Sequence, residues 1–301
     1  MSNASCLRSV LALLASLTAI VGGCSSAPDP TRLPMYDGDR GDRLAWNDLV
    51  ARSLDAEVVL IGEEHDDPNA HALQAALVAD LLALDERTAL SLEMLERDEQ
   101  PLVDAWLANE IDATELVERT GSDSWYDWDA FYQPVLDAAK RSGSPVIAAN
   151  APREFVRRAR LEGYDELRKS TAEELLLFDL PESLDQGGYW DRFQSTMREF
   201  RGDDVDEAAI RRTFSSQMVW DATMGASVAR ALEREDVDRV VHLVGRFHGD
   251  FEGGTVREVK RLRPGTRVLV ISCVAEGDGD SLLADDEGRG QVVVYTLHSA
   301  D

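Results

Sequence analysis

Short apolar runs rich in β-branched residues alternate with stretches of helical periodicity along most of this chain. We expect six runs to be β-strands, because their length and composition are typical of strands. They cover residues 57–61, 88–94, 145–149, 239–244, 267–274 and 291–297. Several are apolar without alternation, as in strands that are covered on both faces. The pattern predicts an α/β fold, with a largely parallel central sheet flanked by helices.

The connections between these runs predict helices. Asp66-Asp67-Pro68 offers a helix cap and a first-turn proline, and leucines at 73, 77, 81 and 84 follow at helical spacing. A second helix is expected over about residues 129–141. Residues 151–238 look wholly helical, which predicts a helical insertion that caps the strand ends, or a separate small domain. The acidic, glycine-rich residues 276–289 predict a surface loop before a final hairpin or edge strand.

The first 23 residues have the features of a lipoprotein signal peptide. Arg8 precedes an apolar stretch that is too short to span a bilayer as a mature helix. The following Val21-Gly22-Gly23-Cys24 resembles a bacterial lipobox, in which Cys24 accepts the lipid. This predicts a membrane anchor in the cell envelope, and Ser25 favours the outer membrane, facing the periplasm. An ordinary secretory signal with a chance cysteine is the alternative.

Residues 24–42 are rich in Ser, Pro, Asp and Gly, and we expect them to form a flexible tether. One folded domain would then cover residues 43–301, with ordered structure beginning between residues 43 and 53. Its only cysteine, Cys273, lies in an apolar run and is expected to be a buried small side chain rather than a nucleophile.

Composition narrows the class of protein. A hydrophobic content of 44% and a charged content of 29% are those of a soluble globular domain. The formal net charge of -26 disfavours nucleic-acid binding, because phosphate contacts need Lys and Arg.

The sequence Gly-x-x-His occurs twice, at residues 62–65 and 245–248, each time directly after a predicted strand. Because the carboxyl ends of parallel strands meet at one edge of a sheet, His65 and His248 are expected to lie close together. Glycine allows the sharp turn or the close backbone approach that such a site needs. An imidazole can bind a metal ion, ligate haem iron or act as a general base.

Other polar residues follow the same strand ends and are candidates for the same site. They are Glu63, Glu64, Glu93, Glu96, Asn150, Arg153 and Arg246. Glu93 lies inside an apolar strand, where burial without a partner is costly, so a role in the site is indicated. Glu63 and Glu64 could equally be solvated turn residues.

The remaining histidines differ in context. His71 is expected near the crevice or on the surface, His242 in the core, and His298 outside any site. Residues 125–132 contain five aromatic rings, which could form core packing or line a pocket for a flat ligand, with Tyr132 or Tyr126 as a phenolate ligand.

Taken together, these segments resemble the ChaN-like haem-binding lipoproteins of the Tiki superfamily. The similar segments are residues 62–68, 91–94, 132–134, 148–153, 217–224 and 245–248, within residues 45–275. The resemblance implies an α/β domain with a helical insertion, binding of haem or iron, and a homodimer that encloses haem. The wider superfamily includes metal-dependent proteases and an esterase-like branch, whose site residues correspond here to His65, His248 and Glu93.

The residues and the resemblance therefore predict two alternative functions. The first is a lipid-anchored haem-binding protein of haem or iron uptake, with a His or Tyr132 as axial ligand, Arg153 or Arg246 pairing with a propionate, and Asn150 nearby. The second is a metal-dependent hydrolase. In it His65, His248 and Glu93 would hold or flank Zn, Mn or Co, Glu64 or Glu63 would be the general base, and Arg153 would stabilise the oxyanion. A third possibility is a crevice that serves only as a surface for partners.

Overall fold

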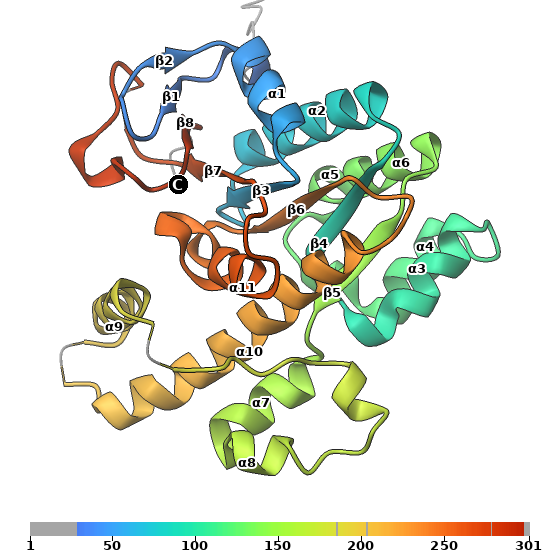
Figure 1. Ribbon diagram of the computed structural model, residues 1–301, viewed down its shortest axis with the longest axis vertical. Coiled ribbons are helices and arrows are strands. Elements are labelled where there is room, and N and C mark those ends of the chain that lie inside the picture. Colours follow the sequence, from blue (N-terminus) through green and yellow to red (C-terminus); the bar gives the residue numbers. More distant parts are fainter. Residues whose placement is uncertain (1–28, 185, 203, 278, 298–301) are drawn as a thin grey trace, which may run out of the picture.

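The computed structural model describes residues 29–184, 186–202, 204–277 and 279–297, which include an eight-stranded sheet in the order β2-β1-β8-β7-β3-β6-β4-β5 (Figure 1). The strands are β1 (Met35–Asp37), β2 (Arg43–Leu44), β3 (Val58–Glu63), β4 (Thr88–Glu96), β5 (Val146–Asn150), β6 (Arg239–Gly245), β7 (Val268–Val274) and β8 (Val292–Tyr295). Pairing is parallel from β8 through β7, β3, β6 and β4 to β5. The predicted α/β class and the six predicted strands are confirmed.

The helices lie on both faces of this sheet (Figure 1). The α-helices are α1 (Trp46–Asp55), α2 (Pro68–Leu84), α3 (Gln100–Leu107), α4 (Ala113–Thr120), α5 (Trp128–Phe131), α6 (Gln133–Ser142), α7 (Arg153–Glu162), α8 (Tyr164–Leu167), α9 (Gly188–Arg201), α10 (Glu207–Ala231) and α11 (Gly254–Leu262). Short 3-10 helices are η1 (Pro30–Arg32), η2 (Arg97–Glu99), η3 (Ser122–Ser124), η4 (Glu174–Leu176), η5 (Arg246–His248), η6 (Asp250–Glu252) and η7 (Ala284–Asp286).

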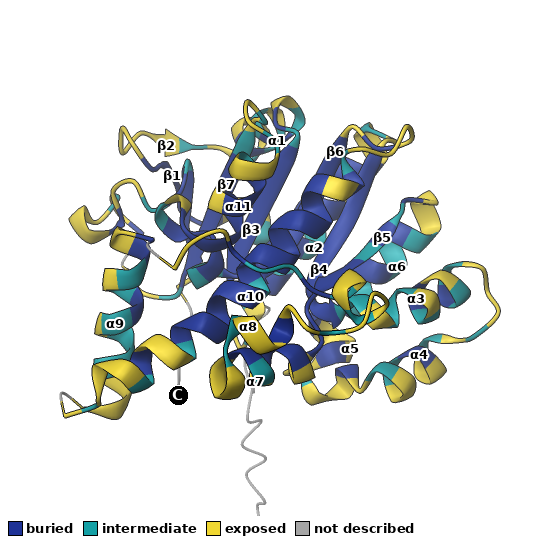
Figure 2. Cartoon of the chain, turned by 60° about the horizontal axis from the view of Figure 1, so that its bottom comes forward, coloured by how far each residue is buried: buried dark blue, intermediate teal, exposed yellow. Residues whose placement is uncertain are grey.

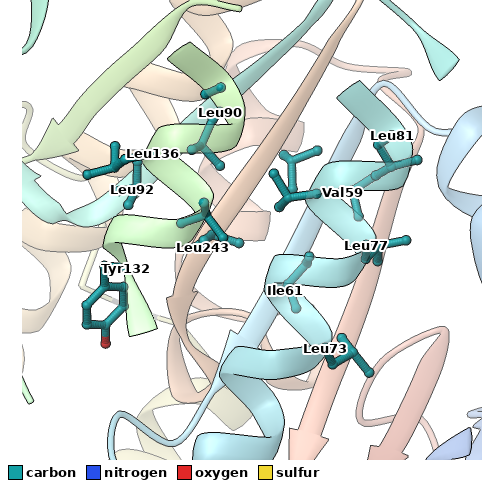
Figure 3. Close-up of a cluster of buried hydrophobic side chains, with 14 of the residues drawn as sticks. Val59, Ile61, Leu73, Leu77, Leu81, Leu90, Leu92, Tyr132, Leu136 and Leu243 are labelled. Carbon is teal, nitrogen blue, oxygen red and sulfur yellow. The ribbon is translucent and has the colours of Figure 1, made fainter. Parts of the chain in front are cut away.

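Alternate residues of each central strand enter two different cores. Val59 and Ile61 of β3 pack with α2 and α6, where Leu77 is one of the fully buried contacts (Figure 3). Val58 and Leu60 of the same strand face α10 and α11 instead. Both faces of the sheet are therefore covered, which explains why its central strands are apolar throughout (Figure 2).

The start of α2 confirms its predicted cap. The Asp67 side chain accepts hydrogen bonds from the backbone amides of Asn69 (2.9 Å) and Ala70 (3.2 Å), and Pro68 occupies the first turn. The second predicted helix, over residues 129–141, is wrong in one respect. It is split at Tyr132 into α5 and α6, because Pro134 lacks a backbone N–H and starts a new helix.

Two expectations near the sheet edge are corrected. Residues 24–42 are not a tether throughout, since β1 pairs antiparallel with β8 and buries Met35 and Tyr36. Consequently β8 lies between β7 and β1 and is not an edge strand. The predicted signal peptide and Cys24 lie outside the described residues. Among the residues that are described, no helix is long and apolar enough to cross a membrane.

The segment between β5 and β6 carries helices α7 to α10, as predicted, but it is not wholly helical, since the described residues between α8 and α9 include only the short η4. The longest of them, α10, does more than cap the strand ends. Its later turns cover one face of the sheet through Met224 and Val228, while Asp221 reaches the polar groups at the strand ends. Most of α10 is buried for this reason (Figure 2).

Candidate functional site

The predicted site residues meet at the carboxyl ends of three neighbouring strands. Glu63 of β3 lies beside Gly245 of β6, and β4 follows on the other side of β6. The backbone amide of Gly245 donates to Oε2 of Glu93 at 2.6 Å, and Nε2 of His248 lies 3.5 Å from Oε1 of Glu93. The structure therefore brings together the two histidines and the strand glutamate, as the parallel sheet predicted.

The imidazole of His65 is oriented by a hydrogen bond to a buried carboxylate. Its Nδ1 lies 2.9 Å from Oε1 of Glu63, whose side chain is inaccessible to solvent. Glu63 also accepts hydrogen bonds from the Tyr132 hydroxyl (2.7 Å) and the Gln74 side-chain amide, and Nδ1 of His71 is 3.4 Å away. Glu63 is thus a buried support for His65 and not a solvated turn residue.

The His65 side chain remains 41% exposed, in contrast to the groups behind it. Burial opposes protonation of His65, but the hydrogen bond to Glu63 and the charge of Glu93 outweigh it and raise the pKa of the imidazole. Since Glu63 occupies Nδ1, the second ring nitrogen, Nε2, is the one available for a ligand or a proton.

His248 has the opposite environment. Its side chain is 8% exposed, its Nδ1 lies 2.7 Å from Oδ1 of Asp221, and its Nε2 faces Glu93. Burial opposes a charge on His248, but Asp221 and Glu93 outweigh it and raise its pKa to about 10. Burial likewise opposes ionisation of Glu93, and the His248 cation lowers the pKa of Glu93 to about 2. Near neutral pH these groups form a buried ionic cluster.

Asp221 is itself fixed by neighbouring helices. It accepts hydrogen bonds from the Tyr189 hydroxyl of α9 at 2.8 Å and from Thr255 Oγ1 of α11 at 3.0 Å. Gln217, one turn earlier on α10, donates to the Tyr189 hydroxyl at 3.0 Å. This support comes from the segment between β5 and β6 and from α11, so the helical segment completes the site.

Each motif glycine makes room for the other motif. A Cβ at Gly245 would lie 3.1 Å from Nε2 of His65, and a Cβ at Gly62 would lie only 2.7 Å from the Cα of Arg246. Neither glycine has a positive φ. Close approach of the two loops, and not a left-handed turn, is therefore the reason for glycine at both positions.

The two candidate arginines are placed differently. Nε of Arg246 lies 2.5 Å from Glu64, and its Nη1 lies 2.8 Å from the buried carboxylate of Asp250. Arg153 is 65% exposed, 3.4 Å from Glu96 and 5.8 Å from the ring centre of Trp125. Arg246 and Glu64 are thus engaged with each other, whereas Arg153 is open to a ligand.

Trp125 connects Arg153 to the histidine site. Its ring meets that of His65 edge-on, with 5.1 Å between the centroids. Beside it lies an open groove of 560 Å³, lined in part by Met94, Glu96, Glu99, Pro152 and Arg153. The groove and the exposed side of His65 therefore share the Trp125 ring.

The other singled-out residues support the site or lie in the core. Asn150 donates to the backbone oxygen of Glu93 at 2.9 Å, which holds the end of β4. Tyr132 is fully buried, and burial together with Glu63 raises the pKa of its phenol, so it is a hydrogen-bond donor and not a free phenolate. Tyr126, by contrast, is 60% exposed.

His71 is buried near the crevice and stacks on Phe131. His242 lies in the core beside Ser91, and burial lowers its pKa to about 4. Cys273 is buried as expected, and His298 lies outside the described residues. Within the described part of the chain, no group of three or more His, Cys, Asp or Glu side chains is arranged to hold a metal ion. A metal role for His65, His248 and Glu93 stays a prediction.

Sequence reasoning missed Asp221, Tyr189, Gln217 and Gln74. Each is a polar residue that is buried in a helix. The sequence did contain a signal for Asp221. This residue follows Ile210, Phe214 and Met218 on an apolar helical face, where an unpaired carboxylate would be costly.

Comparisons with known proteins agree with this architecture. The family model described as "Haem-binding uptake, Tiki superfamily, ChaN" matches residues 49–259. Among solved structures, the chain is similar to ChaN of Campylobacter jejuni, described as showing cofacial heme binding, with 17% identity over 87% of this chain and 95% of that one and a TM-score of 0.66. At this identity the similarity shows the fold alone.

Two other solved structures are more distant. The type III effector HopBA1 is 16% identical over 88% of this chain and 97% of its own, with a TM-score of 0.48. A mutant of the erythromycin esterase EreC is 17% identical over 79% of this chain and 76% of its own, with a TM-score of 0.45. No curated protein matches the chain.

Proposed function

We propose that this protein, which belongs to the haem-binding uptake (ChaN) family of the Tiki superfamily, is a lipid-anchored haem-binding protein of the cell envelope that serves haem or iron uptake. The observation that carries the proposal is the family match over residues 49–259, which includes both Gly-x-x-His motifs and Asp221. The lipobox ending at Cys24 supports the anchor, and Ser25 supports an outer-membrane location. The proposal includes the homodimer that the resemblance to the family implies.

The residues around His65 suit haem. Histidines that ligate a metal commonly donate their other N–H to a carboxylate, as Glu63 would allow here at Nδ1 of His65. Gly245 leaves space beside Nε2 that a Cβ would fill. We therefore propose that Nε2 of His65 would hold the haem iron, with the exposed phenol of Tyr126 as the second candidate. When bound, the haem would supply a Lewis-acidic iron centre at this nitrogen.

Arg153 is the better partner for a haem propionate. Its guanidinium is exposed beside Trp125, whose ring offers a flat apolar surface for a porphyrin. Arg246 already pairs with Glu64 and Asp250, so binding a propionate would cost it those contacts.

Haemin titration of the purified mature protein tests this proposal. We expect a shifted Soret band at micromolar protein, a changed spectrum in His65→Ala, and weaker binding in Arg153→Ala. Arg168→Ala is the matched control, because Arg168 is similarly exposed and pairs only locally with Asp165. No Soret shift in the wild-type protein would overturn haem binding.

The lipid anchor has a separate test. Metabolic labelling with a fatty acid should modify the full-length wild-type protein and not Cys24→Ala. Equal labelling of both, or of neither, would contradict the anchor without affecting the haem result.

A second candidate function is a metal-dependent hydrolase of the protease or esterase type. The observation that favours it is that each motif histidine has its own carboxylate, Glu63 for His65 and Asp221 for His248, which is how a general base or a metal-ligating imidazole is oriented. His65, His248 and Glu93 would hold Zn, Mn or Co, after release of the proton that His248 carries. Glu64 would have to leave Arg246 to act as a base.

Metal content and hydrolysis of a model ester after loading with Zn, Mn or Co discriminate the two candidates. The hydrolase requires stoichiometric metal and turnover that His65→Ala abolishes. Substoichiometric metal together with turnover that is unchanged in His65→Ala would refute it.

A further inference from the structure

A second groove lies along the free edge of the sheet, away from the histidine site. It has a volume of 650 Å³ and is open on one side of β5, between α3, the end of α6 and the last turns of α10. This size is within the range of small-molecule sites, roughly 300 to 1,000 Å³. None of the residues that line it belongs to the 560 Å³ groove beside Trp125 or to the site of His65, Glu93 and His248.

The floor of this groove is closed to a further strand. The Gln100 side chain donates to the backbone oxygen of Val146 at 2.9 Å and accepts from the backbone amide of Ala148 at 2.8 Å. It thereby occupies two of the edge groups that an added peptide strand would use. The groove is therefore better suited to a small molecule than to an extended peptide.

The walls are basic, in a chain whose formal net charge is -26. Four cationic side chains line the groove, namely Arg97, Lys140, Arg230 and Arg234, against two acidic ones, Asp104 and Asp236. Both acids are engaged. Asp236 pairs with Arg234 through two hydrogen bonds, and Asp104 accepts from Gln100.

Three of these cations, Arg97, Arg230 and Lys140, have a single carboxylate between them. Arg97 and Arg230 share the single carboxylate of Asp179, at 2.8 Å and 2.9 Å. Arg97 is nearly buried and uses its other donors on Ser227 and two backbone oxygens, whereas Arg230 is 51% exposed. The ammonium of Lys140 donates to a backbone oxygen of Trp106 and lies 4.4 Å from its ring centre, and no ion pair balances it among the described residues.

We propose that this groove binds a small organic anion that has a carboxylate on an apolar body. The exposed guanidinium of Arg230 has free N–H groups in the fork geometry that matches a carboxylate, and Lys140 adds a second positive charge. The lining also offers apolar side chains, of which the half-buried Ile147 and the strongly exposed Leu176 can contact the body of the ligand. A purely inorganic anion would leave that surface unused.

The test uses octanoate as the probe on the intact mature protein, followed by backbone amide NMR. We expect saturable shifts at Ile147, Ala148 and Ser227, and none with 1-octanol at the same concentration. Arg230→Gln should weaken binding about tenfold, the value of one charge-assisted contact. Arg168→Gln, an exposed arginine with a local partner, should bind like the wild type.

A second variant tests the groove without changing the ion pairs of Asp179 with Arg97 and Arg230. Leu176 is 76% exposed, so Leu176→Glu adds a carboxylate at the groove without altering the core, and it should abolish octanoate binding. Equal shifts with octanoate and octanol, unchanged affinity in Arg230→Gln or Leu176→Glu, or shifts confined to the Trp125 region would each overturn the proposal. Haemin titration of these variants should match the wild type, so this result is independent of the haem site.

Discussion

Replacement of Asp221 by Asn is the sharpest test of the buried ionic cluster. Asp221 is fully buried and accepts hydrogen bonds from His248, Tyr189 and Thr255 at 2.7, 2.8 and 3.0 Å. Asn has the same shape but no charge, so His248 would keep only Glu93, 3.5 Å away, as a charged partner. Breaking a buried charge pair by removing one partner costs about 3 to 5 kcal/mol. Because Asn retains the shape and can still accept, we expect a loss of about 3 kcal/mol near pH 6.

The loss should depend on pH in a defined direction. The pKa of His248 is raised from 6.5 to about 10 in the folded protein. A raised folded pKa contributes stability that is fully present below pH 6.5 and is lost as the pH rises through about 10. Since Asp221→Asn removes the main cause of this shift, the difference in unfolding free energy between wild type and variant should narrow between pH 6.5 and 10.

Urea denaturation at several pH values measures this difference, and NMR titration of the imidazole follows His248 directly. The control is Asp286→Asn, which removes another buried carboxylate that accepts from a tyrosine hydroxyl, Tyr295, and pairs with Arg289. It should leave the His248 titration unchanged. A His248 pKa that stays near 10 in Asp221→Asn, or a stability loss that is constant from pH 6 to 10, would refute the proposed coupling.

Three further predictions address the support of His65, the motif glycine and the core. Tyr132→Phe should destabilise the protein by about 1 to 3 kcal/mol in urea denaturation, because the buried Glu63 loses a donor; the exposed Tyr126→Phe should have no effect. Gly245→Ala should shift the His65 imidazole resonances and weaken haemin binding, because the new Cβ would lie 3.1 Å from Nε2 of His65. The control is Gly188→Ala, which should have neither effect, because its Cβ would contact only one arginine nitrogen, at 3.6 Å. Leu77→Ala should cost about 2 to 5 kcal/mol of unfolding free energy, against less than about 0.5 kcal/mol for Leu84→Ala on the exposed face of the same helix.

The sequence predicted those parts of the fold whose local pattern reflects their final environment. The six central strands are continuous apolar runs because helices cover both faces of the sheet, so their pattern survives without knowledge of the tertiary structure. β1 was missed because it has only three residues, which are too few to show a periodicity, and its neighbours in the sequence are Pro, Asp and Gly. Its strand conformation depends on pairing with β8. The same pairing made β8 an interior strand.

For the site, the sequence predicted positions better than partners. His65, Glu93 and His248 could be placed together because parallel strands share one edge. Asp221 lies 27 residues before His248, on the apolar face of a helix, which marks it as a carboxylate that needs a partner. Only the packing of α10 beside α11 shows that this partner is His248. Arg246 and Arg153 were equal candidates by sequence, and only their surroundings distinguish the paired guanidinium of Arg246 from the open guanidinium of Arg153.

The two Gly-x-x-His motifs have different roles despite their matching sequence contexts. His65 keeps an exposed side and one nitrogen free, whereas His248 is buried between two carboxylates and carries a proton well above neutral pH. While His248 keeps this proton, only His65 would offer an imidazole nitrogen to a haem iron or metal ion. The His248 cation neutralises Glu93 and holds it against the amide of Gly245, the residue whose missing side chain leaves space at His65. His248 would therefore influence ligand binding by positioning Glu93 and Gly245 beside His65. Loss of His248 should change the position of the His65 imidazole even if no ligand contacts His248.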